Sequence, residues 1–524
     1  LIKLVAVLSA KGISVDNMLL GKLWLVMRLL VKQVPETILT YGVSLWVASL
    51  FCRDVKCGFH AFLYGMLSSA FMCALYSIVE FAYLFGAYWG TVALAHINPL
   101  LYDVASAHGW WPPLLEANRV RSMFAEPAYM AVYLSVAIPC AIYQFIVAEK
   151  KKFIWFLLLL MLLIMMIATN SKTAFGILFS EVLMAGIFFF FFRKRITIKS
   201  ILLPLLSIMI ALGVGVGVRN MMIHHYSIDY NVIMNNDNSI HLNITNTGWM
   251  PWQVENGYGL TAAWYDKDWQ GINEIKVPIN RTIAPGESYM VRLDLGESPN
   301  VDIYPNAVVE LERHNAYEKR RVSNEGAAKL VFAMQDGQLV DFDKKNQRNT
   351  ISMTDLSADS GSNRQRYGMM LVDMKIGLEH PFMGVGGTDL KQGYIVERIP
   401  ESLKKNKEVK LWMKYQSEKG ILRSGFPVIS EYPNQFATYG VVGLFLFLLP
   451  SIYALCLLWR SRKKWSYMDN MTCLCTSILC IAFFGLMVSF IGDTATQLYI
   501  YWLILGGLLA WCEYINHRKY TENN

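Results

Sequence analysis

The sequence predicts a mainly α-helical membrane protein, a polytopic transmembrane helical bundle with a large extracytoplasmic loop that contains a β-sandwich insertion. The chain of 524 residues is 54% hydrophobic and 17% charged, which is too apolar for a typical soluble enzyme. Several apolar runs reach the length of about 20 residues that is needed to cross a bilayer. A long polar region, residues 219–432, separates two groups of these runs and contains strand-like stretches.

Apolar runs of spanning length recur toward both ends of the chain. They lie at 35–51, 59–84, 127–148, 153–169, 174–192, 200–218, 436–458, 469–491 and 495–513. A weaker run lies near 18–32, and 85–101 is expected to be a further span or a re-entrant segment. The chain begins with Leu and shows no cleavable signal peptide, so we expect that earlier spans are missing from it.

Basic clusters beside these runs predict the orientation of the chain. They are Arg53 and Lys56, then Lys150, Lys151 and Lys152, then Arg193, Lys194 and Arg195, then Arg460, Arg462, Lys463 and Lys464, and finally Arg518 and Lys519. Counting spans places all of them on one side, which the positive-inside rule makes cytoplasmic. The net charge of +8 therefore does not indicate nucleic acid, which we do not expect as a partner. Segments 102–126, 169–173 and 219–432 are expected to be extracytoplasmic.

Four domains follow from this pattern. We expect N-terminal transmembrane helices at 1–218, the β-sandwich insertion at 219–350, a helical extracytoplasmic loop at 351–432 and C-terminal transmembrane helices at 433–524. The stretches "SIHLNITNTG" and "YMVRLDL" alternate apolar and polar residues, and turn signals such as "APGES" separate the predicted strands. The basic amphipathic stretch 401–420 is expected to lie on the membrane surface or to cover a site.

Aromatic and sulfur side chains carry weaker expectations. The insertion contains Trp249, Trp252, Trp264 and Trp269, which are expected to fill the sandwich core or to stack on sugars. All nine Cys lie in or beside apolar segments, so we interpret them as small buried hydrophobic residues. Their spacing predicts neither a disulfide framework in the polar region nor a metal site.

Five cations gather in the segments that are expected to lie outside. Arg119 and Arg121 belong to "RVRSMFAEPAYM", Lys172 to "TNSKTAFG", and Arg364 and Arg366 to "RQRYGMM". They are either headgroup anchors and a snorkelling lysine or a binding site. Arg binds phosphate through a planar fork and Lys acts as a point charge. Together they would suit a lipid-linked diphosphate and would stabilise its departure without a metal or other cofactor.

The segment that follows these arginines contains a glycine-rich turn. "HPFMGVGGTDL" places Gly384 and Gly386 after a proline, where exposed backbone N–H groups can approach a phosphate closely. No strand precedes the turn, so it does not predict a nucleotide site. His380 is interpreted either as a general base or as a structural residue at a helix end.

These segments together resemble the O-antigen ligase and O-antigen (exopolysaccharide) polymerase superfamily. The resemblance covers about residues 115–220 and 360–450. "RVRSMFAEPAYMAVYL" is similar to the family's Arg-containing approach to a span. "ATNSKTAFGIL" is similar to a helix start of the family, with Lys172 where Arg is usual. "YPNQFATYGVVGLFLF" is similar to the segment that re-enters the membrane, and in it Asn434, Gly440 and Gly443 would serve loop geometry and packing.

The resemblance implies a GT-C-like, metal-independent glycosyltransferase of the bacterial inner membrane with its active site on the periplasmic face. Its donor would be an undecaprenyl-diphosphate-linked oligosaccharide, and its acceptor a second glycan in a polymerase or the lipid A core in a ligase. Lys172 with Arg364 or Arg366 would hold the diphosphate. The lipid bilayer is the remaining partner, and no cofactor is implied.

The sequence departs from the family's ligases at one place. These ligases carry His-Asn shortly before Gly-x-x-Gly, whereas this chain has Ile429-Ser430 there or, with a short gap, Pro433-Asn434. The lack of His favours a polymerase or an altered mechanism and leaves Glu126 and Glu431 as candidate bases. Two other classes are a transporter of lipid-linked sugars, which would need internal repeats and polar residues within spans, and a non-catalytic scaffold that displays the sandwich.

Overall fold

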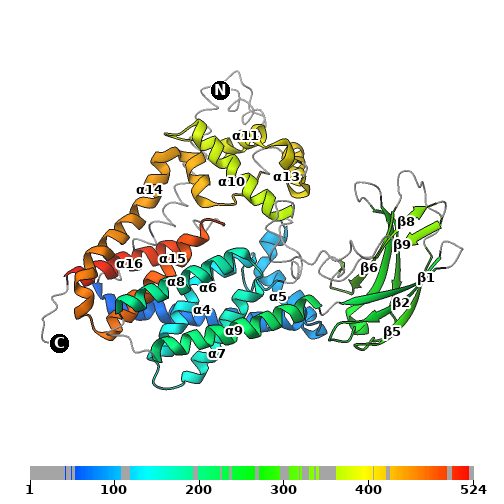
Figure 1. Cartoon of the computed structure of the whole chain (residues 1–524), viewed down its shortest axis with the longest axis horizontal. Coiled ribbons are helices and arrows are strands. Elements are labelled where there is room, and N and C mark those ends of the chain that lie inside the picture. Colours follow the sequence, from blue (N-terminus) through cyan, green and yellow to red (C-terminus); the bar gives the residue numbers. More distant parts are fainter. Residues whose placement is uncertain are drawn as a thin grey trace.

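The computed structural model describes most of the chain between residues 53 and 517. The described residues are 53–107, 119–192, 199–224, 227–234, 239–265, 271–294, 306–321, 330–341, 361–419, 425–492 and 499–517, apart from 125, 318, 336, 337, 387 and 405, together with Gly42, Trp46 and Ser49. The expected weak run at 18–32 and most of 35–51 lie outside these residues. The described part is mainly helical and contains a smaller region of strands (Figure 1).

Four helices in the described part are long and apolar enough to cross a membrane. They are α4 (Val55–Leu84), α6 (Pro127–Val147), α14 (Glu431–Ser461) and α15 (Asn470–Ser489). Further helices are α5 (Tyr88–Ala107), α7 (Lys152–Ala168), α8 (Lys172–Phe192), α9 (Lys199–His224) and α16 (Tyr499–His517). The apolar runs predicted from 59 onward fall largely within these helices, and the segment 85–101 forms part of α5.

One hydrophobic cluster joins the apolar helices. Buried side chains of α4, α6, α7, α8, α15 and α16 meet in it, among them Leu63, Leu134, Leu162, Ile177 and Leu479. Continuous apolar composition lets each helix pack on several neighbours at once, while the remaining apolar faces stay exposed as a bilayer requires. Six of the described cysteines are buried as expected, whereas Cys57 and Cys456 are exposed.

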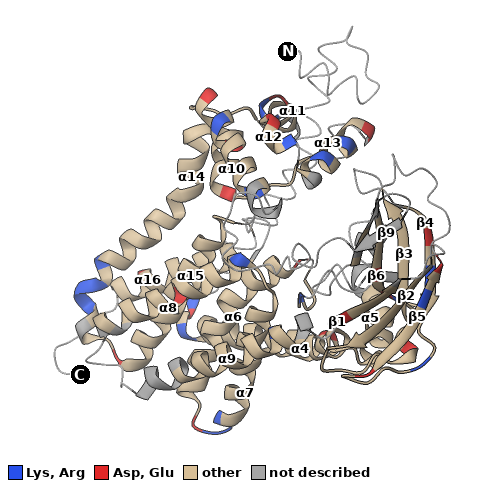
Figure 2. Ribbon diagram, turned by 45° about the vertical axis from the view of Figure 1, so that its right-hand side comes forward, with Lys and Arg blue, Asp and Glu red and all other residues tan. Residues whose placement is uncertain are grey.

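Contacts between helix ends show which residues lie together at each end of this helical part. At one end, Val120 N donates to Ala168 O at 3.0 Å and Glu431 N donates to Phe490 O at 2.9 Å. We call this the Lys172 end, because Lys172 begins α8 there. At the other end, Lys464 Nζ donates to Ile515 O at 3.3 Å. Lys and Arg residues stand out there at the lower ends of α14 and α7 (Figure 2).

The strand region, residues 227–341, contains two antiparallel sheets. Their strands are β1 (Ile228–Met234), β2 (Ser239–Asn246), β3 (Tyr258–Tyr265), β4 (Gly271–Pro278), β5 (Ser288–Asp294), β6 (Asn306–His314), β7 (Lys319–Arg321), β8 (Leu330–Gln335) and β9 (Gln338–Asp341). The first sheet has the order β1-β2-β5, and the second β4-β3-β6-β8-β9, with β7 paired to β6. Residues of both sheets share one hydrophobic cluster, among them Leu242, Leu260 and Leu311.

The tryptophans of the strand region divide between core and contact roles. Trp252 and Trp264 are each 1% exposed and lie in the shared cluster, so they fill the core and are not available to stack on sugars. Trp249 is partly exposed, and its indole Nε1 donates to Met221 O of α9 at 2.8 Å. Trp269 lies outside the described residues.

The strand region contacts the helical part at the end of α4. Asn256 Nδ2 donates to Gly86 O at 2.8 Å, and the Arg313 guanidinium lies 4.7 Å from the centre of the Tyr83 ring. Arg313 is fully buried, so this cation–π contact is shielded from solvent. A short helix, η2 (Val254–Asn256), supplies Asn256.

A second group of helices lies between the strand region and α14 in the chain. It comprises α10 (Gly361–Glu379), α11 (Thr388–Arg398), α12 (Glu401–Lys404) and α13 (Lys407–Lys419), drawn above the apolar helices in Figure 1. Leu403 and Val409, from the basic stretch 401–420, are buried in the same cluster as Met369 of α10. The apolar side of that stretch therefore packs on α10 in this structure.

Candidate functional site at the end of helix α15

The end of α15 is where several predicted site residues meet. A helix leaves its last carbonyl groups without partners inside the helix. Here Phe490 O accepts from Glu431 N at 2.9 Å and from Ser430 Oγ at 3.1 Å. Gly492 O accepts from Arg366 Nη1 at 3.4 Å. The start of α14 and the first turns of α10 are thus held at one helix end.

Lys172 approaches the same helix end from α8. A Cβ placed on Gly492 would lie 3.1 Å from Thr173 Oγ1, so the first turn of α8 adjoins the residue that binds Arg366. Lys172 itself is exposed. The N-terminus of a helix attracts anions through its unpaired N–H groups and its dipole. Lys172, this helix start and Arg366 therefore combine to favour a bound anion.

The two arginines before α6 differ from each other. Val120 N binds Ala168 O, which places both beside the chain that leads from α7 to Lys172. Arg119 is exposed, whereas Arg121 is 2% exposed. The Arg121 guanidinium interacts electrostatically with Glu80, which is fully buried. Arg121 therefore serves as the partner of a buried carboxylate rather than as an open cation.

Glu80 organises the turn before α6. Its carboxylate accepts from Ser122 N at 2.8 Å and from Arg121 N at 3.4 Å. Ser122 has a positive φ of 52°, which side-chain-bearing residues rarely adopt without such support. The sequence analysis did not single out Glu80, although an acidic residue within an apolar helix is a recognisable signal.

The two candidate bases occupy different surroundings. Glu126 precedes α6, is exposed and makes no side-chain cap hydrogen bond. Glu431 is 2% exposed and accepts a hydrogen bond from Gln435 Nε2 at 2.6 Å. Because its backbone N–H binds Phe490 O, Glu431 lies at the same helix end as Arg366. Of the two carboxylates, Glu431 is the one whose backbone is held at the helix end that also binds Arg366.

The predicted glycines interlock α14 with the turn after α10. Gly440 has a φ of 68° and interrupts the helical geometry of α14. A Cβ there would lie 2.2 Å from Phe382 O, and a Cβ on Gly384 would lie 2.4 Å from Thr438 O. Gly386 N donates to Thr438 O at 2.9 Å. Gly443 follows the kink, where a Cβ would meet Tyr439.

Asn434 belongs to a buried polar cluster that the sequence analysis missed. Lys391 Nζ of α11 donates to Asn434 Oδ1 at 2.7 Å and to Asp373 Oδ2 of α10 at 3.1 Å. Lys391 and Asp373 are 1% and 5% exposed. Burial raises the pKa of Asp373, and the Lys391 ammonium opposes this rise. The sequence signal for this cluster is the acidic residue Asp373. It lies between Met369 and Ile376 of α10 at the spacing of a buried helix face, where a charged residue needs a partner.

The remaining predicted residues lie at the two ends of α10. Arg364 lies in the first turns of α10, two residues before Arg366. His380 follows the end of α10, and its ring packs edge-on against Tyr394 at 5.2 Å. That contact joins the end of α10 to α11.

Neither a metal site among the described residues nor a similarity to known proteins is found. Among the described residues there is no group of three or more His, Cys, Asp or Glu that could hold a metal ion. Comparison of the chain with family models, curated proteins and solved structures finds no match.

Proposed function

We propose that the protein is a metal-independent glycosyltransferase that polymerises surface polysaccharide on the outer face of the bacterial inner membrane. Its donor is an undecaprenyl-diphosphate-linked glycan. The apolar helices form a GT-C-like membrane bundle, and the strand region is a β-sandwich insertion on the periplasmic side. The observation that carries the proposal is the convergence of Lys172, Arg366 and Glu431 on the end of α15.

The reaction we infer is an inverting displacement. A hydroxyl oxygen of the acceptor glycan attacks the anomeric carbon of the donor sugar. The bond from that carbon to the diphosphate oxygen breaks, and the diphosphate leaves with the electron pair. Arg366 and Lys172 stabilise the charge that develops on the diphosphate. A general base must lie close to the attacking group. We assign this role to Glu431, because it is held at the same helix end as Arg366, and it accepts the hydroxyl proton.

The assay uses purified protein with lipid-linked repeat units. Longer glycan ladders are expected, and Arg366→Ala and Lys172→Ala are each expected to reduce their formation by about 100-fold, because a lost cation in a diphosphate site costs several kcal/mol. Lys152→Ala is the matched control, because Lys152 is also an exposed lysine that opens a helix, at the opposite end. Normal ladders from both site variants would refute the assignment of the site.

The same assay separates the alternatives. Transfer of the glycan to a lipid A core acceptor, without ladders, would identify an O-antigen ligase. Movement of lipid-linked sugar across proteoliposome membranes without any new glycosidic bond would identify a transporter. The lack of a His before Gly440 supports the polymerase over the ligase.

A further inference from the structure

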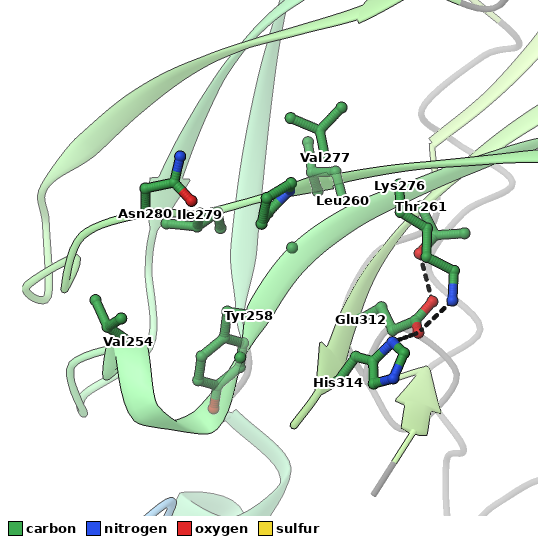
Figure 3. A pocket seen from close by; sticks show the side chains of 13 residues that line it. Val254, Tyr258, Leu260, Thr261, Lys276, Val277, Ile279, Asn280, Glu312 and His314 are labelled. Carbon is green, nitrogen blue, oxygen red and sulfur yellow. Dashed lines mark hydrogen bonds and ion pairs between the residues drawn. The ribbon is translucent and has the colours of Figure 1, made fainter. Parts of the chain in front are cut away.

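A cavity in the strand region lies apart from the end of α15. It has a volume of about 340 Å³ and opens beside strands β3, β4 and β6 (Figure 3). Cavities that bind small organic ligands in proteins have volumes of about 300–1,000 Å³. The cavity is therefore large enough for a small ligand, and its lining decides the class of that ligand.

A glycine creates the hollow. Gly259 of β3 pairs with Pro278 of β4 on one side and with Glu312 of β6 on the other. Directly paired residues of an antiparallel sheet point to the same face, so Gly259 leaves a gap in the row of side chains. A Cβ at this position would lie 2.8 Å from Val277 O, which means that backbone closes the bottom of the gap.

One wall of the cavity is polar and is built around Glu312. The side chain of Glu312 is 2% exposed. Its carboxylate lies 3.3 Å from Lys276 Nζ and 3.7 Å from His314 Nδ1. Thr261 Oγ1 also donates to it. Figure 3 shows these side chains pointing toward one another from three strands. Lys276 and His314 remain partly exposed, so their polar atoms border the opening.

The opposite wall is largely apolar. Val254 and Pro278 line it, and Asn280 adds an amide at the rim. A wall of this kind suits the C–H face of a sugar ring, while carboxylate, amine and hydroxyl groups suit its hydroxyls. Apolar contact and hydrogen bonding from opposite sides are what an amphipathic ring needs.

The charges of the lining argue against other ligands. A phosphate site gathers cations, but Lys276 is already shared between Glu312 and Glu274, each at 3.3 Å. Both carboxylates would repel a second anion. A purely apolar ligand would leave the buried carboxylate against hydrocarbon at a large energetic cost. A neutral, hydroxyl-rich ligand is not repelled by the carboxylates and can form hydrogen bonds with them.

The cavity lies where the strand region contacts α4. Val254 and Gly257 flank Asn256, which binds Gly86 O, and His314 N donates to Gly257 O at 2.8 Å. Arg313, the neighbour of His314, covers the Tyr83 ring. The cavity therefore adjoins the residues through which the strand region contacts the helical part.

We propose that this cavity is a non-catalytic saccharide-binding site that holds a neutral sugar unit of the glycan through the polar group around Glu312 and the wall of Val254 and Pro278. The link to a glycan rests on the proposed function, whereas the binding of a saccharide does not require catalysis. Bound there, the glycan would be retained near the membrane between successive additions.

The test measures binding by the full-length chain in detergent. The probes are soluble oligosaccharides of one and two repeat units, released by mild acid from the surface polysaccharide of the cell that makes the protein. Calorimetry is expected to detect binding, and inorganic diphosphate in excess is expected not to compete. Val254→Trp, which fills the cavity from its 43% exposed rim, is expected to weaken binding at least tenfold. Met290→Trp, at a 62% exposed position on β5, is the control and is expected to bind normally.

Further variants separate this proposal from the proposed function. Asn280→Ala, at the exposed rim of the cavity, is expected to weaken binding with an unchanged thermal unfolding temperature, and Arg366→Ala is expected to bind the probe as the parent does. No binding by the parent, displacement by diphosphate, or equal binding by Val254→Trp would each overturn the saccharide site. A parent protein that binds the probe but makes no glycan ladders would contradict the proposed function and leave the saccharide site supported.

Discussion

Gly440 shows how a single residue fixes the geometry beside the site. Its φ of 68° is accessible to glycine, whereas other residues reach it only with strain. The approach of Phe382 O also leaves no room for a side chain. Gly384 has the reciprocal arrangement against Thr438, with a φ of 63°. The two glycines therefore let the turn after α10 insert into the bend of α14.

Gly440→Ala is expected to destabilise the protein by about 1–3 kcal/mol from backbone strain alone, and by more if the clash with Phe382 O is not relieved. Thermal unfolding of the purified protein in detergent measures the change. Gly217→Ala in α9 is the control, because nothing lies within 4 Å of a Cβ there, and replacing a helical glycine is worth at most about 1 kcal/mol in its favour. Equal stability of Gly440→Ala and its parent would contradict this geometry.

Single residues differ in how far the sequence predicts their position. Lys172 and the glycines are marked by their local context, a helix start between apolar runs and a turn after proline. The sequence predicts Arg121 as an outer cation, because its partner Glu80 lies 41 residues earlier and the sequence alone does not pair them. The cavity around Glu312 depends on the register of three strands, which the sequence does not specify.

At the scale of elements, the cluster of Asp373, Lys391 and Asn434 joins α10, α11 and α14. A buried ion pair contributes little to stability over an apolar replacement, but removing one partner leaves an uncompensated charge. The cluster therefore fixes which faces of the three helices meet. It also holds the first turn of α14, and with it Glu431, in a defined orientation.

Lys391→Met is expected to destabilise this helix group by about 3–5 kcal/mol, the usual cost of breaking a buried pair. The double variant Asp373→Asn/Lys391→Met is expected to recover most of that loss, because no buried charge remains. Unfolding in denaturant measures both, with Lys410→Met at an exposed position of α13 as the control. A double variant no more stable than the single one would exclude the unpaired charge as the cause.

The deficit of Lys391→Met is expected to depend on pH. Burial raises the pKa of Asp373 and Lys391 opposes this rise, so removing Lys391 raises the pKa further. A raised carboxyl pKa gives stability that is present at pH below the ordinary value of about 4 and is lost as pH rises through the folded value. The deficit relative to the parent should therefore be larger at pH 7 than at pH 5. An equal deficit at both would contradict an ionisable cause.

The elements themselves were largely predictable, but their partners were not. Long apolar runs predict helices because composition and length suffice. Helix α14 begins at Glu431, before its predicted apolar run at 436, because polar contacts with α15 and α11 also hold its first turn. The strand order β4-β3-β6-β8-β9 rests on pairings between distant segments, which alternation within one strand does not specify.

At the scale of the whole molecule, the ends of the helices predict which residues share a side of the membrane. Lys172 and Lys463 are both exposed and lie at opposite ends of the helical part. The Lys172 end also carries the strand region, through the contact of Asn256 with Gly86 at the end of α4. The predicted orientation makes this the external side.

Labelling with a membrane-impermeant maleimide tests this orientation. The parent has Cys52, Cys57 and Cys456 replaced by Ser. In spheroplasts, Lys172→Cys is expected to react at once and Lys463→Cys only after permeabilisation, because positively charged loops stay in the cytoplasm. The reverse pattern would invert the topology and move the candidate site to the cytoplasmic side.

The bend at Gly440 has a mechanical consequence. Ala437, before the bend, packs with α10 and α11, whereas Phe447, after it, belongs to the cluster of the apolar helices. One long helix thus links two clusters of buried side chains, with the bend at Gly440 between them. Hydrogen bonds from Ser430, Glu431 and Arg366 to the end of α15 join the two clusters a second time, and each contributes about 0.5–1.5 kcal/mol net. The bend therefore sets the angle at which the α10–α13 helix group meets the apolar helices, and these hydrogen bonds help to hold that angle.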